Sequence, residues 1–168
     1  MPRRPPPPFP DLQALLGDAR RVAVVGAGSD LRGDDVAGVL VARRLAAWAA
    51  REGVRELAAF AAGAAPENFT GEIARHRPDL VVVVDAAHLG LEPGAVAVVD
   101  ASKVAGVAFS THMLPLPIFL DYLARTTGCR TLVLGIEIVQ KDVLGPVSPP
   151  VERAVRRLAA AFRRRFAR

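Results

Sequence analysis

Apolar positions follow two alternating patterns along the chain. Short continuous runs, such as Leu80 to Val84, are typical of buried strands, whereas apolar residues three and four positions apart, as in residues 34–50, are typical of helices. Strands are predicted at residues 21–26, 54–60, 80–85, 95–99 and 130–139, and helices at residues 11–19, 34–50, 67–76, 116–126 and 149–168. Because strands alternate with helices, we expect an α/β fold in which a mostly parallel sheet is covered by helices on both faces.

The N-terminal residues fit neither pattern. They contain the proline run Pro5 to Pro8, which can form neither a helix nor a central strand. We therefore expect residues 1–10 to be a proline-rich mobile tail. The remaining length, residues 11–168, is enough for a single α/β domain with one core.

The charge is concentrated at the C-terminus. The formal net charge is +5, and seven arginines fall within the last 16 residues. Aromatic residues make up only 5% of the chain, and the C-terminal arginines lack the regular alternation with aromatic residues that is typical of nucleic-acid-binding surfaces. We therefore expect a solvated arginine-rich helix and no nucleic-acid partner.

Cysteine content and hydropathy suggest the cellular compartment. Cys129 is the only cysteine, so the chain can form neither an intrachain disulfide nor a cysteine-based zinc site. The sequence has no run of 18 apolar residues and no apolar segment typical of a signal peptide. These features predict a cytoplasmic protein without a membrane span.

Candidate chemistry lies after the predicted strands, because ligands of open α/β sheets bind beyond the carboxyl ends of the strands. A glycine-rich segment leading to Asp34 and Asp35 follows the first strand, Asp85 ends the run of four valines, and His112 follows residues 104–109. A carboxylate at the end of an apolar strand needs a polar partner or a metal. Two carboxylates and one imidazole form a mixed oxygen and nitrogen set that suits nickel, zinc and related divalent ions.

Other interpretations of the same residues remain open at this point. Gly26 and Gly28 fit the first two positions of a dinucleotide-binding loop, but Leu31 occupies the third, and no acidic residue follows the second predicted strand. The loop thus matches the dinucleotide-binding pattern only in part, and a small-ligand or nucleotide-binding module remains an alternative. Asp34 and Asp35 could also simply stabilise the start of the helix that follows them.

Residues 24–38, which read VVGAGSDLRGDDVAG, resemble the N-terminal signature of hydrogenase maturation endopeptidases. The resemblance covers roughly residues 21–160 and includes residues 63–68, 82–86, 110–115 and 134–136. It is greatest to the branch that processes formate-hydrogenlyase-type hydrogenases. Two positions depart from the family pattern: Ser29 replaces an asparagine, and Ala61, Ala62 and Gly63 replace an Asp-Gly-Gly turn.

The resemblance implies a three-layer fold, in which a twisted five-stranded sheet lies between helices. It also implies an endopeptidase, aspartic-type by family classification, that removes the C-terminal extension of a [NiFe]-hydrogenase large-subunit precursor after nickel insertion. In that family, the residues matching Asp35, Asp85 and His112 contact the metal, and Asp34 and the Gly63 loop would shape the site. Nickel would arrive with the substrate, although other divalent ions could occupy the site.

The expected partner is therefore the large-subunit precursor, and we expect the protein to be a monomer. Asp35, Asp85 and His112 are the predicted catalytic and metal-binding residues, with Asp35 or Asp85 as the candidate general base. His88 is interpreted as a loop residue that could support Asp85. A non-catalytic chaperone, which would bind the nickel-loaded precursor and release it uncut, remains the main alternative.

Overall fold

The computed structural model describes residues 8–31, 33–100, 115–139 and 145–167. They form a five-stranded sheet with the order β2-β1-β3-β5-β4. The strands are β1 (Val22–Ala27), β2 (Leu57–Gly63), β3 (Leu80–Ala87), β4 (Val96–Val99) and β5 (Arg130–Glu137). Four strands run parallel, and only β4 is antiparallel to its neighbour β5. The predicted α/β fold with a mostly parallel, five-stranded sheet is thus confirmed.

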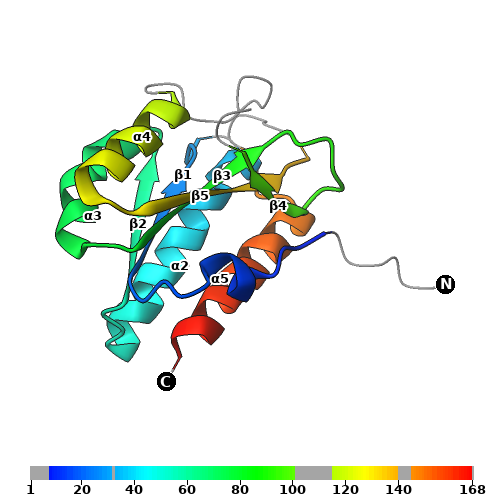
Figure 1. The fold of residues 1–168 in the computed structure, drawn as a ribbon. Coiled ribbons are helices and arrows are strands. Elements are labelled where there is room, and N and C mark those ends of the chain that lie inside the picture. The colour runs from blue at the N-terminus through cyan, green and yellow to red at the C-terminus, as the bar shows by residue number, and fades with distance from the viewer. Residues whose placement is uncertain (1–7, 32, 101–114, 140–144, 168) are drawn as a thin grey trace.

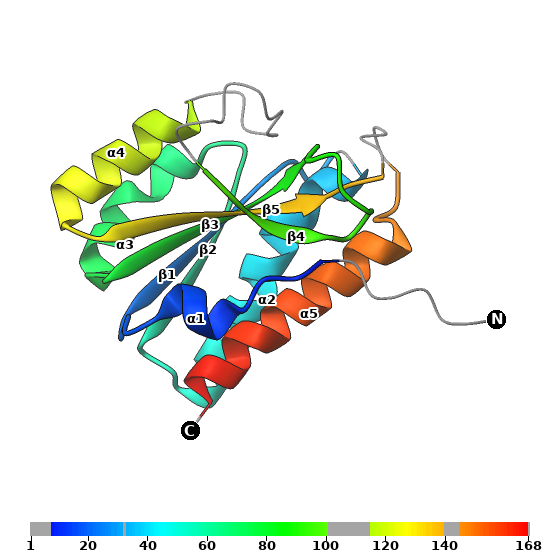
Figure 2. The same ribbon diagram turned by 45° about the vertical axis from the view of Figure 1, so that its right-hand side comes forward.

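Helices cover both faces of the sheet, which gives the three layers visible in Figures 1 and 2. One face packs against α1 (Leu12–Leu16), α2 (Ala37–Glu52) and α5 (Pro149–Phe166). The other face packs against α3 (Thr70–His76) and α4 (Leu116–Thr127). Two short 3-10 helices, η1 (Gly33–Val36) and η2 (Pro66–Phe69), lead into α2 and α3.

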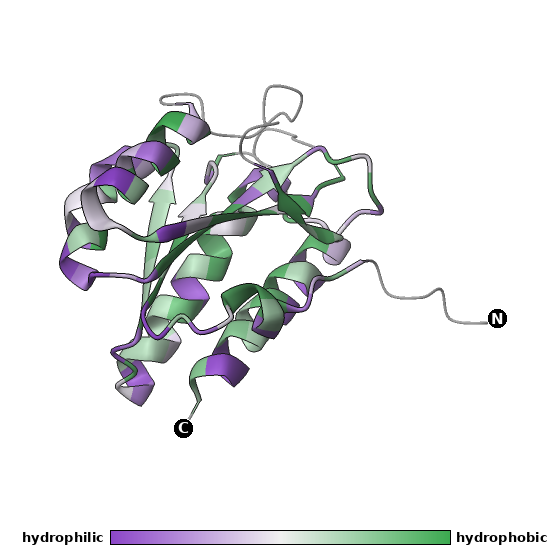
Figure 3. Ribbon diagram, viewed as in Figure 1, coloured by the Kyte–Doolittle hydropathy of each residue, from purple (hydrophilic) through white to green (hydrophobic). Residues whose placement is uncertain are grey.

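The core follows from side-chain alternation along the central strand β3, which is buried along its whole length. Val82 and Val84 face the layer of α1, α2 and α5. Val81 and Val83 face the layer of α3 and α4. The helices are amphipathic, and Figure 3 shows hydrophilic positions on their outer sides and hydrophobic positions toward the sheet.

Several predicted elements have different bounds in the structure, and two of these differences have local reasons. The predicted strand at residues 54–60 is observed at Leu57–Gly63, because α2 continues to Glu52 and ends at Gly53, whose φ is +66°. The predicted helix at residues 11–19 ends at Leu16. The Asp11 side chain caps the start of this helix by accepting hydrogen bonds from two backbone N–H groups of the first turn.

The end of the proline-rich segment lies against the domain. The backbone N–H of Val96 donates to the carbonyl of Pro8 at 2.9 Å. The Arg157 guanidinium stands 4.2 Å from the centroid of the Phe9 ring, which packs against the core. Residues 8 and 9 of the predicted tail thus contact the domain. Residues 1–7 lie outside the described part of the chain.

Within the described residues, none of the helices combines the length and the apolar character that crossing a membrane requires.

Candidate functional site

The loop after β1 is held by backbone contacts that only glycine permits. Gly28 has a φ of +136°, and a Cβ atom at this position would lie 1.9 Å from the carbonyl oxygen of Asp35. The N–H of Gly28 donates to the carbonyl of Gly63 at 3.0 Å, and the N–H of Ser29 donates to that of Asp35 at 3.2 Å. The loop thus folds back onto η1, where Asp34 and Asp35 lie.

A second glycine contact brings the start of α2 against the sheet. A Cβ atom on Gly26 would lie 2.1 Å from the carbonyl oxygen of Gly38, and one on Gly38 would lie 2.1 Å from that of Val84. The helix backbone therefore touches β1 and β3 with no side chain between them. This close approach fixes η1, at the start of the helix, beside the end of β3.

Asp35 and Asp85 are the two predicted site residues that the structure describes. Asp85 is fully buried near the end of β3, and Asp35 in η1 is 1% exposed. Asp85 pairs with Gly135 of β5. It directly follows Val84, which pairs with Gly26 of β1. Because η1 contacts β3, the structure brings the two carboxylates to the same carboxyl edge of the sheet.

The third predicted residue, His112, lies outside the described residues. Within the described ranges, no group of three or more His, Cys, Asp or Glu side chains is arranged to hold a metal ion. The predicted three-residue metal site therefore stays a prediction. Its two described members supply carboxylate oxygens, which are among the ligands that divalent ions use in proteins.

Asp34 has a role that the sequence did not reveal. Its buried carboxylate accepts hydrogen bonds from the N–H of Val139 at 3.0 Å and from the N–H and Oγ of Ser148 at 2.6 and 2.9 Å. These partners flank the connection between β5 and α5. Asp34 thus anchors η1 to distant parts of the chain, which is more than the local helix-start role considered for it.

Glu137 is a buried acid that was not predicted from the sequence. It ends β5, is 5% exposed, and accepts hydrogen bonds from the N–H groups of Leu89 at 2.7 Å and Leu91 at 2.9 Å. His88 lies in the same loop, with its Nδ1 atom 3.8 Å from Oε1 of Glu137. Asp85 was predicted as a site residue because it is a carboxylate at the end of an apolar strand. Glu137 has the same kind of position and could have been identified in the same way.

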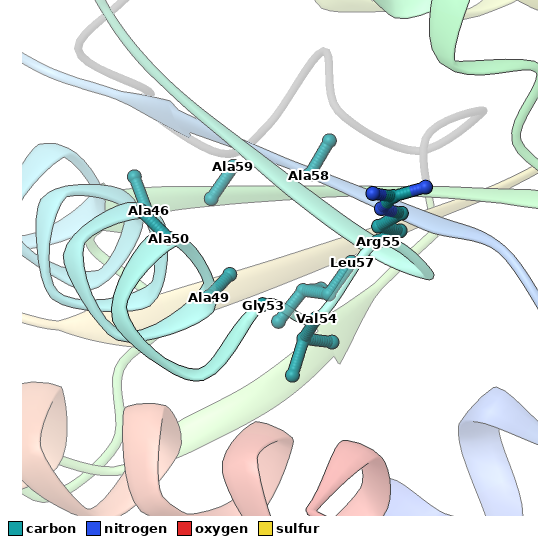
Figure 4. Close-up of a pocket in the computed structure, with 9 residues that line it drawn as sticks. All are labelled: Ala46, Ala49, Ala50, Gly53, Val54, Arg55, Leu57, Ala58 and Ala59. Carbon is teal, nitrogen blue, oxygen red and sulfur yellow. The ribbon is translucent and has the colours of Figure 1, made fainter.

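A hollow of 350 Å³ lies elsewhere, between the end of α2 and the start of β2 (Figure 4). Its lining residues are Ala46, Ala49, Ala50, Gly53, Val54, Arg55, Leu57, Ala58 and Ala59. This lining contains no carboxylate, imidazole, thiol or hydroxyl, so it offers no group for hydrolysis. The candidate chemistry therefore belongs to the carboxyl edge.

The sequence model of HycI, described as a hydrogenase maturation protease, matches residues 39–164 of the chain. The chain belongs to the hydrogenase maturation protease family. The resemblance read from residues 24–38 and from the later motifs is thereby confirmed.

Individual members of the hydrogenase maturation protease family agree with this assignment. The chain is 34% identical over 137 residues to the hydrogenase 3 maturation protease of Escherichia coli K12. The matched region covers 76% of this chain and 80% of that protein. The crystal structure of a [NiFe] hydrogenase maturation protease from Thermococcus kodakarensis KOD1 superposes with a TM-score of 0.81 at 33% identity, covering 94% of this chain and 99% of the other. The crystal structure of the hydrogenase 3 maturation protease gives a TM-score of 0.70 at 28% identity, covering 83% and 87%.

Proposed function

We propose that the protein is an endopeptidase that removes the C-terminal extension from a [NiFe]-hydrogenase large-subunit precursor after nickel insertion. The observation that carries the proposal is the pair of buried carboxylates, Asp35 and Asp85, at the carboxyl edge of a chain that belongs to this protease family. The named relatives are hydrogenase maturation proteases. The substrate and the role of nickel are the proposed part.

Nickel would enter the site as part of the substrate. Asp35, Asp85 and His112 would add oxygen and nitrogen ligands to a nickel ion that the precursor already holds, which makes cleavage depend on nickel loading. Carboxylates buried in a water-poor edge interact favourably with cations and with hydrogen-bond donors. Nickel held by the precursor would therefore attract these carboxylates, and nickel-free precursor would lack this attraction.

The chain's own residues would then hydrolyse one peptide bond. The oxygen of a water molecule adds to the scissile carbonyl carbon while Asp35 or Asp85 accepts the water proton. The same proton passes to the leaving amide nitrogen as the carbon–nitrogen bond breaks. The products are a new carboxyl end on the large subunit and a free amine on the released extension.

The glycine-rich loop supports this proposal over nucleotide binding. Phosphate-binding loops point their backbone N–H groups at the ligand. In this chain the N–H groups of Gly28 and Ser29 already donate to backbone carbonyls. The carbonyl oxygen of Asp35 also packs closely against Gly28, since it lies 1.9 Å from where a Cβ atom would stand.

We also propose that the enzyme acts in the cytoplasm as a monomer. Its single cysteine, Cys129, is buried, and a chain without disulfides suits a reducing compartment.

The test compares nickel-loaded and nickel-free precursor, with the products read by mass. We expect cleavage of the loaded form only, and a loss of at least about 100-fold in rate for Asp85→Asn or Asp35→Asn, because a positioned acid or base contributes roughly 10²–10⁴-fold. Asp79→Asn is the matched control, since Asp79 is an exposed carboxylate on the opposite edge of the sheet.

Each alternative has a distinct outcome in this experiment. An Asp85→Asn variant that cleaves at the wild-type rate would sink the proposed site. Equal cleavage of nickel-free precursor would remove nickel from the mechanism. Binding of the loaded precursor without cleavage would favour the chaperone, and thermal stabilisation by nucleotide alone would favour the small-ligand module.

A further inference from the structure

Large apolar side chains are exposed around the carboxyl edge. Among the described residues, Leu31 is 64% exposed, Leu91 40% and Val139 48%. They lie in the segments that leave β1, β3 and β5, which are neighbours in the sheet. These three residues are called the apolar rim. Because these parallel strands end at the same edge of the sheet, all three residues follow strand ends at the edge that holds Asp35 and Asp85.

Each residue of the apolar rim has its backbone held in place by a side chain of this same edge. The N–H of Leu31 donates to Oγ of Ser29 at 3.3 Å, that of Leu91 to Oε2 of Glu137 at 2.9 Å, and that of Val139 to Oδ2 of Asp34 at 3.0 Å. Exposed apolar side chains on unrestrained loops would pay an entropy cost on binding. Here three side-chain oxygens reduce that cost in advance.

Three acidic side chains beside the rim are already paired in the described structure. Asp30, next to Leu31, forms an ion pair with Arg43 at 2.9 Å. The carboxylates of Glu137 and Asp34 are directed to backbone N–H groups. The described rim therefore offers apolar contact more than charge, which suits an uncharged stretch of polypeptide.

We infer that the apolar rim is the docking surface for an apolar segment of the large-subunit precursor beside the scissile bond. The inference rests on the proposed function, because a chain that reaches Asp35 and Asp85 must cross this edge. Leu31, Leu91 and Val139 would then set the specificity of the protease for the sequence around its cleavage site.

The test uses single substitutions with a closely matched control. Val139→Ser alters the rim, and Val98→Ser alters an equally exposed valine, 46% against 48%, on the edge strand β4. We expect Val139→Ser, Leu31→Ser and Leu91→Ser each to raise the KM for nickel-loaded precursor by about fivefold to tenfold, with kcat within twofold of wild type. Val98→Ser should leave both parameters unchanged.

Binding of nickel-free precursor separates this inference from the proposed function. The rim contacts polypeptide and not metal, so the rim variants should weaken binding of the nickel-free precursor by the same factor as they raise KM. That result would support the rim even if no cleavage were found and the peptidase proposal failed. Conversely, cleavage that depends on Asp85 together with unchanged binding by all three rim variants would overturn the rim alone.

Two further outcomes would also overturn the inference. If Val98→Ser weakened precursor binding as much as Val139→Ser, the effect would reflect general surface hydrophobicity. If the rim variants changed self-association in sedimentation without changing precursor binding, the rim would be an interface between two copies of the chain.

Discussion

Carboxylates hold backbone N–H groups at both edges of the sheet, but their surroundings differ. At the carboxyl edge, Asp34 is 1% exposed and binds segments that flank the β5–α5 connection. At the amino edge, Asp79 is exposed, and its Oδ2 atom accepts from the N–H groups of Arg20 and Arg21 at 2.8 and 2.7 Å. The bonding is alike, but Asp34 is shielded from water and Asp79 is not.

The difference separates structural carboxylates from candidate catalytic ones. A solvated carboxylate such as Asp79 can stabilise a turn, but water competes with any substrate group it could bind. Buried carboxylates such as Asp35 and Asp85 interact more strongly with charge because the surroundings are less polar. The alanine-lined hollow beside β2 shows the converse, since it is open space without reactive groups. Burial combined with chemistry, not space alone, marks the candidate site.

Two glycines provide the largest expected contrast between the edges. Gly38→Ala should destabilise the fold by about 3 kcal/mol or more, because its Cβ would lie 2.1 Å from the backbone oxygen of Val84. Gly53→Ala at the amino edge should cost only about 1 kcal/mol, since its φ is +66° but no atom lies within 4 Å of the added Cβ. Urea denaturation measures both, and similar losses would contradict the tight contact between α2 and the sheet.

The two structural carboxylates provide the next contrast. Asp34→Asn should lower the free energy of unfolding by about 2 kcal/mol, because a buried charged acceptor of three hydrogen bonds becomes a neutral amide. Asp79→Asn should lower it less, because water can solvate the exposed group. Thermal unfolding of the two variants side by side tests this order. A larger loss for Asp79→Asn would mean that burial is not what distinguishes the edges.

The smallest expected effect is a pH dependence at the amino edge. Burial, and then the nearby charge of Arg21, lower the pKa of His76 from its ordinary value of 6.5. As pH falls below about 6.5, the unfolded chain therefore takes up a proton before the folded chain does, and stability decreases until the pH passes the folded pKa. Stability measured from pH 7.5 to 5.5 should show this decrease, and His76→Gln should reduce it.

Asp79 contributes in a separate and more acidic range. Hydrogen bonds from the backbone N–H groups of Arg21 and Arg20 lower the pKa of its carboxyl from 3.8. Its contribution to stability is therefore complete above pH 3.8 and is lost as the pH falls through the lowered value.

An unchanged profile of stability against pH for His76→Gln between pH 7.5 and 5.5 would assign the decrease in that range to other groups.

Local patterns were enough to predict most of the fold. The valine run of β3 and the helical spacing of α2 gave an α/β sheet, and the family resemblance gave its five strands. The direction of β4 was not predicted, because a short apolar run looks the same in parallel and antiparallel strands. The first turn of the helix predicted at residues 34–50 is instead the 3-10 helix η1, in which the carbonyl of Asp35 accepts from the N–H of Ser29 and lies close to Gly28.

The candidate site was predictable where one residue stood out from its neighbours. Asp85 could be identified because it ends an apolar strand, and Asp35 because the family motif contains it. The anchoring role of Asp34 could not be predicted, since its partners are 105 and 114 residues away and no local spacing encodes them. The link between Glu137 and Leu89 was hidden in the same way, over 48 residues.

The bonds of Asp34 also have a consequence for the order in which the protein is made. A ribosome releases the η1 segment long before it has synthesised Val139 and Ser148, so a growing chain cannot complete these hydrogen bonds. The edge that carries Asp35 is therefore finished only after Ser148 has emerged. Translation products that stop before Ser148 should therefore lack an ordered site.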